Sequence, residues 1–277
     1  MDRVSIVVPT TDIERLKYLI KSLSTQTLRP YEVVIVAKNV NVLYLESTCE
    51  RHGLRCVILE QVEGFFTRAL NMGRKAASGD IVVFTDDDAI ALPKWVERYV
   101  KLFEVYGSGV GCVSSRDIYI DLENLRLMPT PDDRAHVKLY RYLTRPLFEK
   151  PLPILEKYWC GVYIGKDYYV KHGPCIPSKE CYSLPFRGVN MAFRKGAIEN
   201  AKFPEHPKLR RAPGNEQYVG IQLILKGWDC VYTPNNPILH MFREESLSRG
   251  VRGRKLVNEE LITRRLYEEL LTSVQTK

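Results

Sequence analysis

The stretch SGDIVVFTDDDAI, residues 78–90, decides the fold. A small polar turn leads into an apolar run at 80–85, and three adjacent carboxylates follow it, Asp86, Asp87 and Asp88. A short apolar run bounded by Gly and polar residues is typical of a buried strand. Carboxylates in contact disfavour one another's ionisation. The cluster is therefore either a solvated polar turn or a site for a cation.

Strand and helix signals alternate on both sides of this stretch. Strands are predicted at 4–8, 32–37, 54–59 and 80–85, with others in VGCVSS and DCVYTP. One helix is predicted after the cap residue Asp12, and another begins at Pro93. Between them, a helix with a face of small residues, Ala69, Met72, Gly73 and Ala76, is predicted to end at Gly79. This alternation predicts an α/β fold with a mostly parallel sheet and right-handed crossovers. Ligands bind beyond the carboxyl ends of such strands, so the loops after Val8 and Val36 should meet the aspartate cluster.

The second half of the chain is less regular. Residues 122–185 are rich in Pro, Tyr and basic residues, and residues 256–272 form an amphipathic pattern with Leu261, Leu266 and Leu270 near one face. The segment 246–277 is therefore expected to be a flexible loop followed by a C-terminal helix.

Composition narrows the class of protein. The chain has 277 residues and a formal net charge of +8, and no apolar run approaches 18 residues. The first residues lack the apolar length of a signal peptide, so a cytoplasmic location is expected. The basic residues gather at 134–150, 208–211 and 243–255 rather than in one tract with interleaved aromatics, so no nucleic-acid partner is expected.

The seven cysteines include no CxxC pair, which excludes the usual zinc spacing. Cys49 with Cys56, and Cys175 with Cys181, are close enough in sequence to bridge a loop. Reduced thiols are nevertheless the expectation for a cytosolic protein, with hyperthermophiles as the exception.

Asp86 and Asp88 form a DxD motif, which places two carboxylates on a short backbone. Oxygen ligands of this kind suit Mg²⁺ or Mn²⁺ and leave other coordination positions for phosphate oxygens. Acidic turns are common, so the motif alone leaves both interpretations open.

Four segments together resemble the family 2 glycosyltransferases. They are VSIVVPT with LIKSLSTQTLRPYEVVIV, then EGFFTRALNMGRKAASGDIVVFTDDDAI, FRGVNMAFRKGAI and GNEQYVGIQLILKGWDCVYTP, which occur in the family's order over residues 3–245. The resemblance implies a GT-A fold, with 1–245 as one catalytic domain. Within it, about 1–120 would be the nucleotide-sugar half and 121–245 the acceptor half.

The resemblance also implies roles at the donor site. Asp86 would contact the nucleoside and Asp88 the metal that bridges the donor's two phosphates, while Asp87, between them, would border the nucleotide and be largely solvated. Pro9 and Thr10 would lie near the base. His240 occupies a position that supplies a metal or phosphate contact in some relatives, and a strand-end histidine without a ligand role is the alternative.

Glu216, in GNEQ, takes the place that the family usually gives to an aspartate base. It would accept the proton of an acceptor hydroxyl as that oxygen attacks the anomeric carbon, so that a single in-line displacement inverts the configuration. The alternative is a solvated glutamate that favours the start of a helix.

Several positions depart from the family pattern. The acidic residue that often binds the base after the second strand is replaced by Ala37 and Lys38; Lys38 could reach a phosphate, and Asn39 a base edge. Arg68 lies two positions before the place where members of the family often have an arginine. The donor is therefore expected to be a UDP- or GDP-type nucleotide-diphosphate sugar, without a choice between the two.

On the acceptor side, Asn190 of the G-x-N-M-A-F-R motif and Trp159 are expected to contact a sugar. Arg243, Arg249 and Arg252 could meet diphosphate charge from a mobile loop, or lie in a solvated linker. The acceptor would be a glycan, a lipid-linked or another hydroxyl compound.

The basic, tyrosine-rich middle, YRYLTRPLFEKPLPILEKYW, could border the acceptor, touch anionic lipid at the inner membrane face, or form an oligomer surface. Two other functions stay open. One is a nucleotidyltransferase that makes sugar nucleotides, although no glycine-rich basic loop follows the first strand. The other is a non-catalytic basic binding protein with the same fold.

Overall fold

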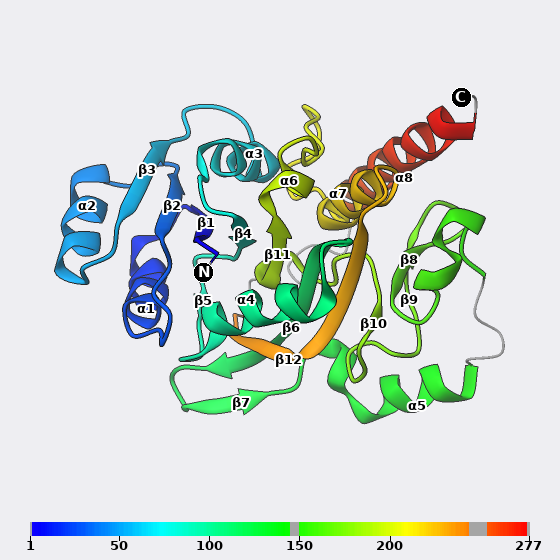
Figure 1. Ribbon diagram of the computed structural model, residues 1–277, viewed down its shortest axis with the longest axis horizontal. Coiled ribbons are helices and arrows are strands. Elements are labelled where there is room, and N and C mark those ends of the chain that lie inside the picture. Colours follow the sequence, from blue (N-terminus) through cyan, green and yellow to red (C-terminus); the bar gives the residue numbers. More distant parts are fainter. Residues whose placement is uncertain (1, 145–149, 244–253, 276–277) are drawn as a thin grey trace.

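The computed structural model describes residues 2–144, 150–243 and 254–275 (Figure 1). The strands are β1 (Val4–Thr10), β2 (Glu32–Ala37), β3 (Cys56–Glu60), β4 (Ile81–Phe84), β5 (Ala89–Ile90), β6 (Val110–Asp121), β7 (Arg126–Met128), β8 (Val162–Ile164), β9 (Val170–His172), β10 (Cys181–Tyr182), β11 (Met191–Arg194) and β12 (Asp229–Met241). The α-helices are α1 (Ile13–Ser24), α2 (Val42–Arg51), α3 (Phe66–Ala76), α4 (Trp95–Tyr106), α5 (Ala135–Thr144), α6 (Lys195–Ile198), α7 (Asn215–Ile224) and α8 (Arg254–Gln275). Short 3₁₀ helices are η1 (Pro131–Asp133), η3 (Pro153–Tyr158) and η4 (Gly188–Asn190).

One mixed sheet runs through the molecule in the order β10-β12-β6-β11-β4-β1-β2-β3, with β5 beside β12 and β7 beside β6. Neighbours β4, β1, β2 and β3 are parallel, as are β6 and β12, whereas β11 is antiparallel to both β4 and β6. The expected α/β fold with a mostly parallel sheet is confirmed. Strand β11 joins the two parallel groups into a continuous sheet.

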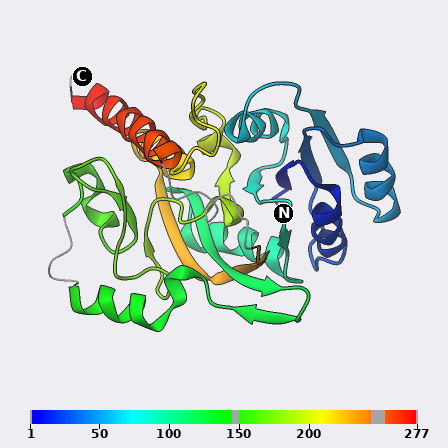
Figure 2. The same cartoon turned by 180° about the vertical axis from the view of Figure 1, so that it is seen from behind.

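The two faces of the sheet carry two hydrophobic clusters, as the alternation of side chains in a strand requires. Ile6 and Val8 of β1 face one cluster, which α1, α2 and α4 cover, and Val7 faces the other, which α3, α6, α7 and α8 cover. Figure 2 shows the same layers from behind. Helix α3 lies very close to β1 because Gly73 faces Val7; a Cβ at Gly73 would come within 2.3 Å of Val7.

The predicted elements of the first half are confirmed with small shifts. Strand β2 has the predicted bounds, and Asp12 caps α1 by accepting hydrogen bonds from the backbone N–H groups of Glu14 and Arg15. Helix α3 ends at Ala76 rather than at Gly79, and α4 begins at Trp95, two residues after Pro93. Helix α2 has no counterpart among the predicted elements.

The cysteine pattern differs from the expectation of reduced thiols. Disulfides join Cys49 to Cys56 and Cys160 to Cys175. The pairing of Cys175 with Cys181 is therefore wrong, because the loop after β9 folds back and the Cys175 N–H donates to the Cys160 carbonyl at 2.8 Å. Cys181 is a free thiol.

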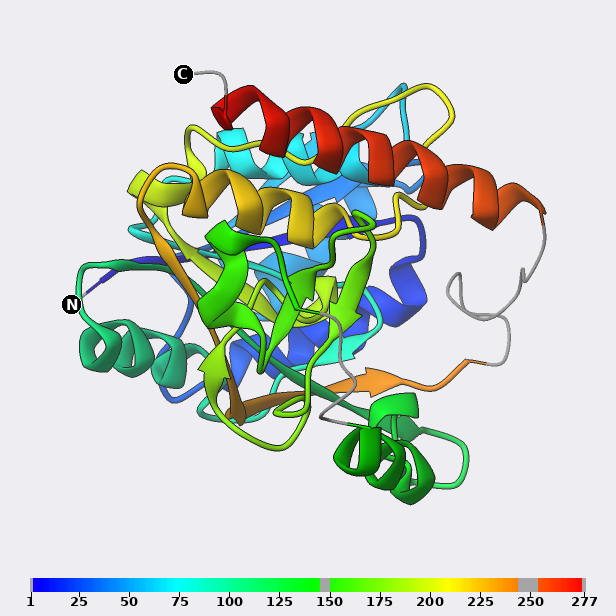
Figure 3. The same cartoon turned by 90° about the vertical axis from the view of Figure 1, so that its right-hand side faces the viewer.

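Helix α8 lies over α7 (Figure 3). Its buried face consists of Glu259, Thr263, Tyr267 and Leu271, each one turn apart, whereas Leu261 is 40% exposed. The predicted position of Leu261 on the buried face is therefore wrong, because the polar residues Glu259 and Thr263 take part in the packing, whereas Leu270 packs against the second hydrophobic cluster. Within the parts of the chain that the structure describes, no helix has both the length and the apolar character to cross a membrane.

Candidate active site

The aspartate cluster is held by two strands at once. It follows β4 directly, and β5, immediately after it, pairs with β12 so that Ala89 lies opposite His240. The Met241 N–H also donates to the Asp88 carbonyl at 2.9 Å. The end of β4 and the end of β12 are thereby fixed side by side, although they are far apart in the sequence.

Asp88 is 1% exposed, and two cationic groups contact it. His240 Nε2 lies 3.3 Å from Asp88 Oδ1, and the Arg243 guanidinium forms an ion pair with Oδ2. Burial alone would raise the pKa of Asp88, but the His240 hydrogen bond and the charges of His240 and Arg243 lower it. Asp88 is therefore a carboxylate at neutral pH.

Asp86 completes a group of three potential metal ligands with Asp88 and His240, whose ligand atoms lie within 4.8 Å of one another. Burial and the charge of Asp88 raise the pKa of Asp86 to about 7. Two carboxylates and one imidazole are a donor set that Mn²⁺ accepts readily, whereas Mg²⁺ prefers oxygen alone. The residues present therefore fit a divalent cation.

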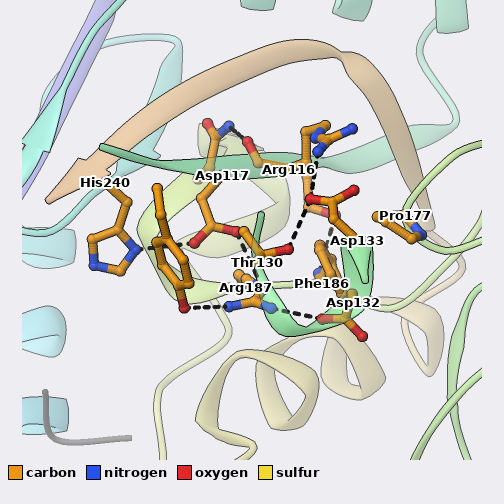
Figure 4. A network of polar contacts seen from close by, with 12 residues as sticks. Arg116, Asp117, Thr130, Asp132, Asp133, Pro177, Phe186, Arg187 and His240 are labelled. Carbon is orange, nitrogen blue, oxygen red and sulfur yellow. Dashed lines mark hydrogen bonds and ion pairs between the residues drawn. The ribbon is translucent and has the colours of Figure 1, made fainter. Parts of the chain in front are cut away.

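Asp117, in the middle of β6, orients His240 (Figure 4). Its Oδ2 lies 3.0 Å from His240 Nδ1, and its Oδ1 lies 3.3 Å from Arg187 Nε. The two carboxylates hold the imidazole between them and, against the effect of burial, raise the pKa of His240 to about 10. A carboxylate behind a ligand histidine fixes the ring and aims its other nitrogen at the metal position.

Arg187 extends this network toward the acceptor half. Its Nη2 donates to Asp132 Oδ2 at 2.6 Å, and His172 Nδ1 lies 3.3 Å from Asp132 Oδ1. The charge of Arg187 also lowers the pKa of Glu216, partly offsetting burial. One chain of contacts thus runs from Asp88 through His240, Asp117 and Arg187 to Asp132.

Glu216 lies in the first turn of α7, and burial raises its pKa above the ordinary value. Its charge is also among those that raise the pKa of Asp86. Helix α8 holds the loop before α7: Glu259 Oε2 accepts from the N–H groups of Arg211 and Ala212 at 2.9 and 3.0 Å, and the Tyr267 hydroxyl donates to the Gly214 carbonyl. Glu216 is therefore placed by a fixed turn.

Asp87 differs from the expectation of a solvated residue. Its Oδ2 accepts from the Thr10 hydroxyl at 2.9 Å, and Arg15 Nε lies 3.6 Å from its Oδ1. The parallel pairing of β1 with β4 brings Thr10 beside the cluster, and the Asp87 side chain is only 12% exposed. Asp87 thus ties the end of β1 to the end of β4.

The other predicted nucleotide contacts lie along the same edge. Pro9 and Thr10 end β1, and Lys38 and Asn39 follow β2. The Lys38 N–H donates to the Thr10 carbonyl, and Lys38 Nζ donates to the Gly64 carbonyl at 2.6 Å. Arg68, in the first turns of α3, is exposed and lies against Gly64. The convergence of these loops at the carboxyl edge is as predicted, and their contact with a nucleotide stays a prediction.

Asn190 is not available to a sugar. It is 0% exposed, its amide donates to the Arg116 and Asn236 carbonyls, and its Oδ1 accepts from Trp95 and Tyr99. The motif asparagine is therefore a buried cross-link between strands, which corrects its predicted role as a sugar contact.

Trp159 is half-buried and packs against the second hydrophobic cluster, and its contact with a sugar stays a prediction. Arg243 pairs with Asp88, so it would have to leave that carboxylate to meet a diphosphate. Arg249 and Arg252 lie outside the described residues.

The sequence reasoning missed Asp117, Arg187 and Asp132. The signal for Asp117 was present, since an Arg-Asp pair interrupts the strand pattern VGCVSSRDIYI. A buried charge in a strand requires a partner. The partner itself, His240, was not predictable from spacing, because 123 residues separate the two.

The mixed sheet with its flanking helices, and the ligand cluster at the strand ends, are those of a GT-A-type fold. Residues 5–167, more than half of the chain, match the family model described as glycosyl transferase family 2. The chain therefore belongs to that family, which confirms the family and the enzyme class, a glycosyltransferase, expected from the sequence.

Relatives agree with this assignment. The chain is 28% identical over 217 residues to the protein of Bacillus subtilis (strain 168) described as the uncharacterized glycosyltransferase YwdF, which covers 70% of this chain and 79% of that protein. The mannosyltransferase PcManGT from Pyrobaculum calidifontis, solved with GDP-Man and Mn²⁺, is similar with a TM-score of 0.57 at 16% identity, over 99% of this chain and 75% of that one.

Two further solved structures are similar in fold. S. aureus TarS 1-349 in complex with UDP has a TM-score of 0.60 at 15% identity, over 97% of this chain and 65% of that one. GalNAc-T7 with UDP, GalNAc and Mn²⁺ has a TM-score of 0.66 at 14% identity, over 95% of this chain and 47% of that one. The chain thus spans less than two thirds of both structures.

Proposed function

We propose that this protein transfers a sugar from a nucleotide-diphosphate sugar to an acceptor hydroxyl in a metal-dependent, inverting reaction. The observation that carries the proposal is the convergence of Asp86, Asp88 and His240, whose ligand atoms lie within 4.8 Å of one another. The charge of Glu216 also raises the pKa of Asp86, which supports its part in the same site. The single sheet through both halves supports treating 1–245 as one catalytic domain, with the nucleotide-sugar half before about residue 120.

Asp88 and His240 would hold the cation, and Asp86 would contact the cation or the nucleoside. A divalent cation held there would neutralise the diphosphate leaving group. Mn²⁺ is the favoured ion over Mg²⁺ because of the imidazole ligand, and PcManGT and GalNAc-T7 were both solved with Mn²⁺. Thr10, Lys38, Asn39 and Arg68 line the edge where a nucleotide of the UDP or GDP type would lie.

Glu216 is the general base of this proposal. As the acceptor oxygen bonds to the anomeric carbon, the bond from that carbon to the diphosphate breaks and the hydroxyl proton passes to the Glu216 carboxylate. A base with a raised pKa holds that proton better than an exposed glutamate does. One displacement of this kind inverts the anomeric configuration. The family match favours this reaction over the nucleotidyltransferase and non-catalytic alternatives.

A donor panel tests the proposal. UDP- and GDP-sugars are incubated with the protein, with Mn²⁺ or with a chelator, and released nucleotide diphosphate is measured. Release from at least one donor only when Mn²⁺ is present supports the proposal, and release that is equal with the chelator contradicts it. Once an acceptor is known, a product with retained anomeric configuration rules out the single displacement.

A further inference from the structure

Helix α5 presents apolar side chains to solvent. Leu139, Tyr140 and Leu143 are 57%, 65% and 65% exposed. Residues at i, i+1 and i+4 share one face of a helix. Elsewhere among the described residues, exposed large apolar side chains are mostly scattered, which is ordinary for a protein surface, but a cluster on one helix face indicates a contact site.

The helix lies at the lower edge of the molecule in Figure 1, and Figure 3 shows the same placement from the side. Its start is fixed, because η1 directly precedes it and is part of the network of Figure 4. Asp132 binds Arg187, and Asp133 accepts from Arg116 at 2.6 Å and from Thr130 at 2.9 Å. The apolar face is thereby held at a set position relative to the candidate active site.

A second exposed apolar pair lies in the hairpin of β6 and β7. Leu125 and Leu127 are 81% and 58% exposed, and the hairpin lies at the same lower edge in Figures 1 and 2.

The basic character of residues 134–144 favours an anionic partner. Residues 134–144 contain Arg134, Lys138 and Arg141 and no Asp or Glu, and Arg134 is exposed. Before the helix, Asp132 and Asp133 are engaged in ion pairs. A second copy of the chain would bring two basic helices together, which repel each other across an isologous interface. An anionic lipid surface attracts the basic residues, and its acyl boundary takes up the apolar side chains.

We propose that α5 is an interfacial helix that docks the protein on an anionic membrane surface, with Leu139, Tyr140 and Leu143 in contact with lipid. The docking does not depend on the transfer reaction proposed above. Docking places η1 next to the membrane. Because Asp132 of η1 binds Arg187, the candidate active site is also held near the membrane.

The test compares sedimentation with vesicles of phosphatidylcholine containing phosphatidylglycerol and of phosphatidylcholine alone. The wild-type protein is expected to bind the anionic vesicles and to be released by salt. The double variant Leu139→Glu/Leu143→Glu should bind roughly 100-fold more weakly, because two leucine side chains no longer leave water. Equal binding of the wild type and the double variant would overturn the proposal.

A matched control carries the same added charge elsewhere. Leu43→Glu/Val105→Glu changes two exposed apolar residues on α2 and α4, which are 75% and 79% exposed. This control should keep vesicle binding; loss equal to that of the α5 variant shows an effect of net charge alone and contradicts the proposal. Light scattering without lipid tests the alternative that α5 binds a second copy of the chain. A wild-type dimer that becomes a monomer in the α5 variant would support that alternative and contradict membrane docking. Metal-dependent nucleotide binding should be unchanged in the α5 variant.

Discussion

The proposed nucleotide-sugar half, about residues 1–120, and the proposed acceptor half, residues 121–245, share one sheet but place their candidate residues differently. In the first half, most candidate residues lie at the end of a parallel strand or just after it: Thr10 ends β1, Lys38 follows β2 and Asp86 follows β4. In the second half, His240 and Glu216 are placed by side chains distant in sequence, Asp117 and Tyr267 among them.

The difference shows which part of such a site local structure can specify. Strand register alone brings the donor edge together, because parallel strands end on the same side. The acceptor half lacks that regularity and relies on a buried polar network, which fixes geometry only if its members are all satisfied. Substitutions should therefore act locally in the first half and through partners in the second.

The largest effect is expected from Asp88→Asn. Loss of this carboxylate removes a proposed metal ligand, so transfer should fall at least roughly thousandfold, as expected for several kcal/mol of lost charge stabilisation. Asp80→Asn, at the opposite end of β4, is the matched control because the half-exposed Asp80 carboxylate contacts the side chain and the backbone N–H of Arg3, away from the ligand cluster. Transfer rates are measured with Mn²⁺. An equal fall in both variants would contradict a specific role of Asp88 in the reaction.

Glu216→Gln should lower transfer about 100- to 10,000-fold while donor binding, measured by calorimetry, is retained. Because burial raises the Glu216 pKa and the base must be ionised, the wild-type rate should fall as the pH drops through that raised pKa. The acidic fall should be absent from the residual rate of the variant. Glu268→Gln, on the exposed side of α8, is the control. Unchanged transfer by Glu216→Gln would remove it from the mechanism.

Asp117→Asn should weaken Mn²⁺ binding about 10- to 100-fold, because His240 loses the carboxylate that orients its ring. Electron paramagnetic resonance of free Mn²⁺ gives this affinity without any transfer assay. Asp121→Asn, at the partly exposed end of the same strand, should leave the affinity unchanged. A folded Asp117→Asn variant with wild-type Mn²⁺ affinity would contradict the positioning role.

The smallest effect is expected from Tyr267→Phe, which removes the hydrogen bond to the Gly214 carbonyl before α7. The free energy of unfolding should fall by about 1 kcal/mol, measured by urea denaturation. Tyr18→Phe, at a half-exposed position of α1, should change it little. Equal changes in the two variants would mean that α8 does not hold the turn that carries Glu216.

Prediction from the sequence also succeeded to different degrees in the first and second halves of the chain. The parallel strands of the first half and the convergence of Thr10, Lys38 and Asp88 followed from periodicity and from the rule for parallel sheets. Asp87 was misjudged because its partner, Thr10, lies on another strand, and hydrogen bonds between strands depend on register.

In the second half, sequence patterns located residues but not their environments. Asn190 was assigned to a sugar because it lies in a motif that resembles the family's acceptor-side motif, yet its hydrogen-bonding groups are used inside the protein. The disulfide of Cys160 and Cys175 depends on the path of the β8–β9 hairpin, which spacing does not reveal. Long-range contacts of this kind need the tertiary structure.

The most direct test of the metal site is a crystal structure of the protein soaked with Mn²⁺ and a nucleoside diphosphate, with anomalous scattering recorded for manganese. We predict a single strong peak within about 2.5 Å of Asp88 and His240, with Arg243 displaced from Asp88. A peak elsewhere, or an intact pair of Arg243 and Asp88 beside bound nucleotide, would contradict the account.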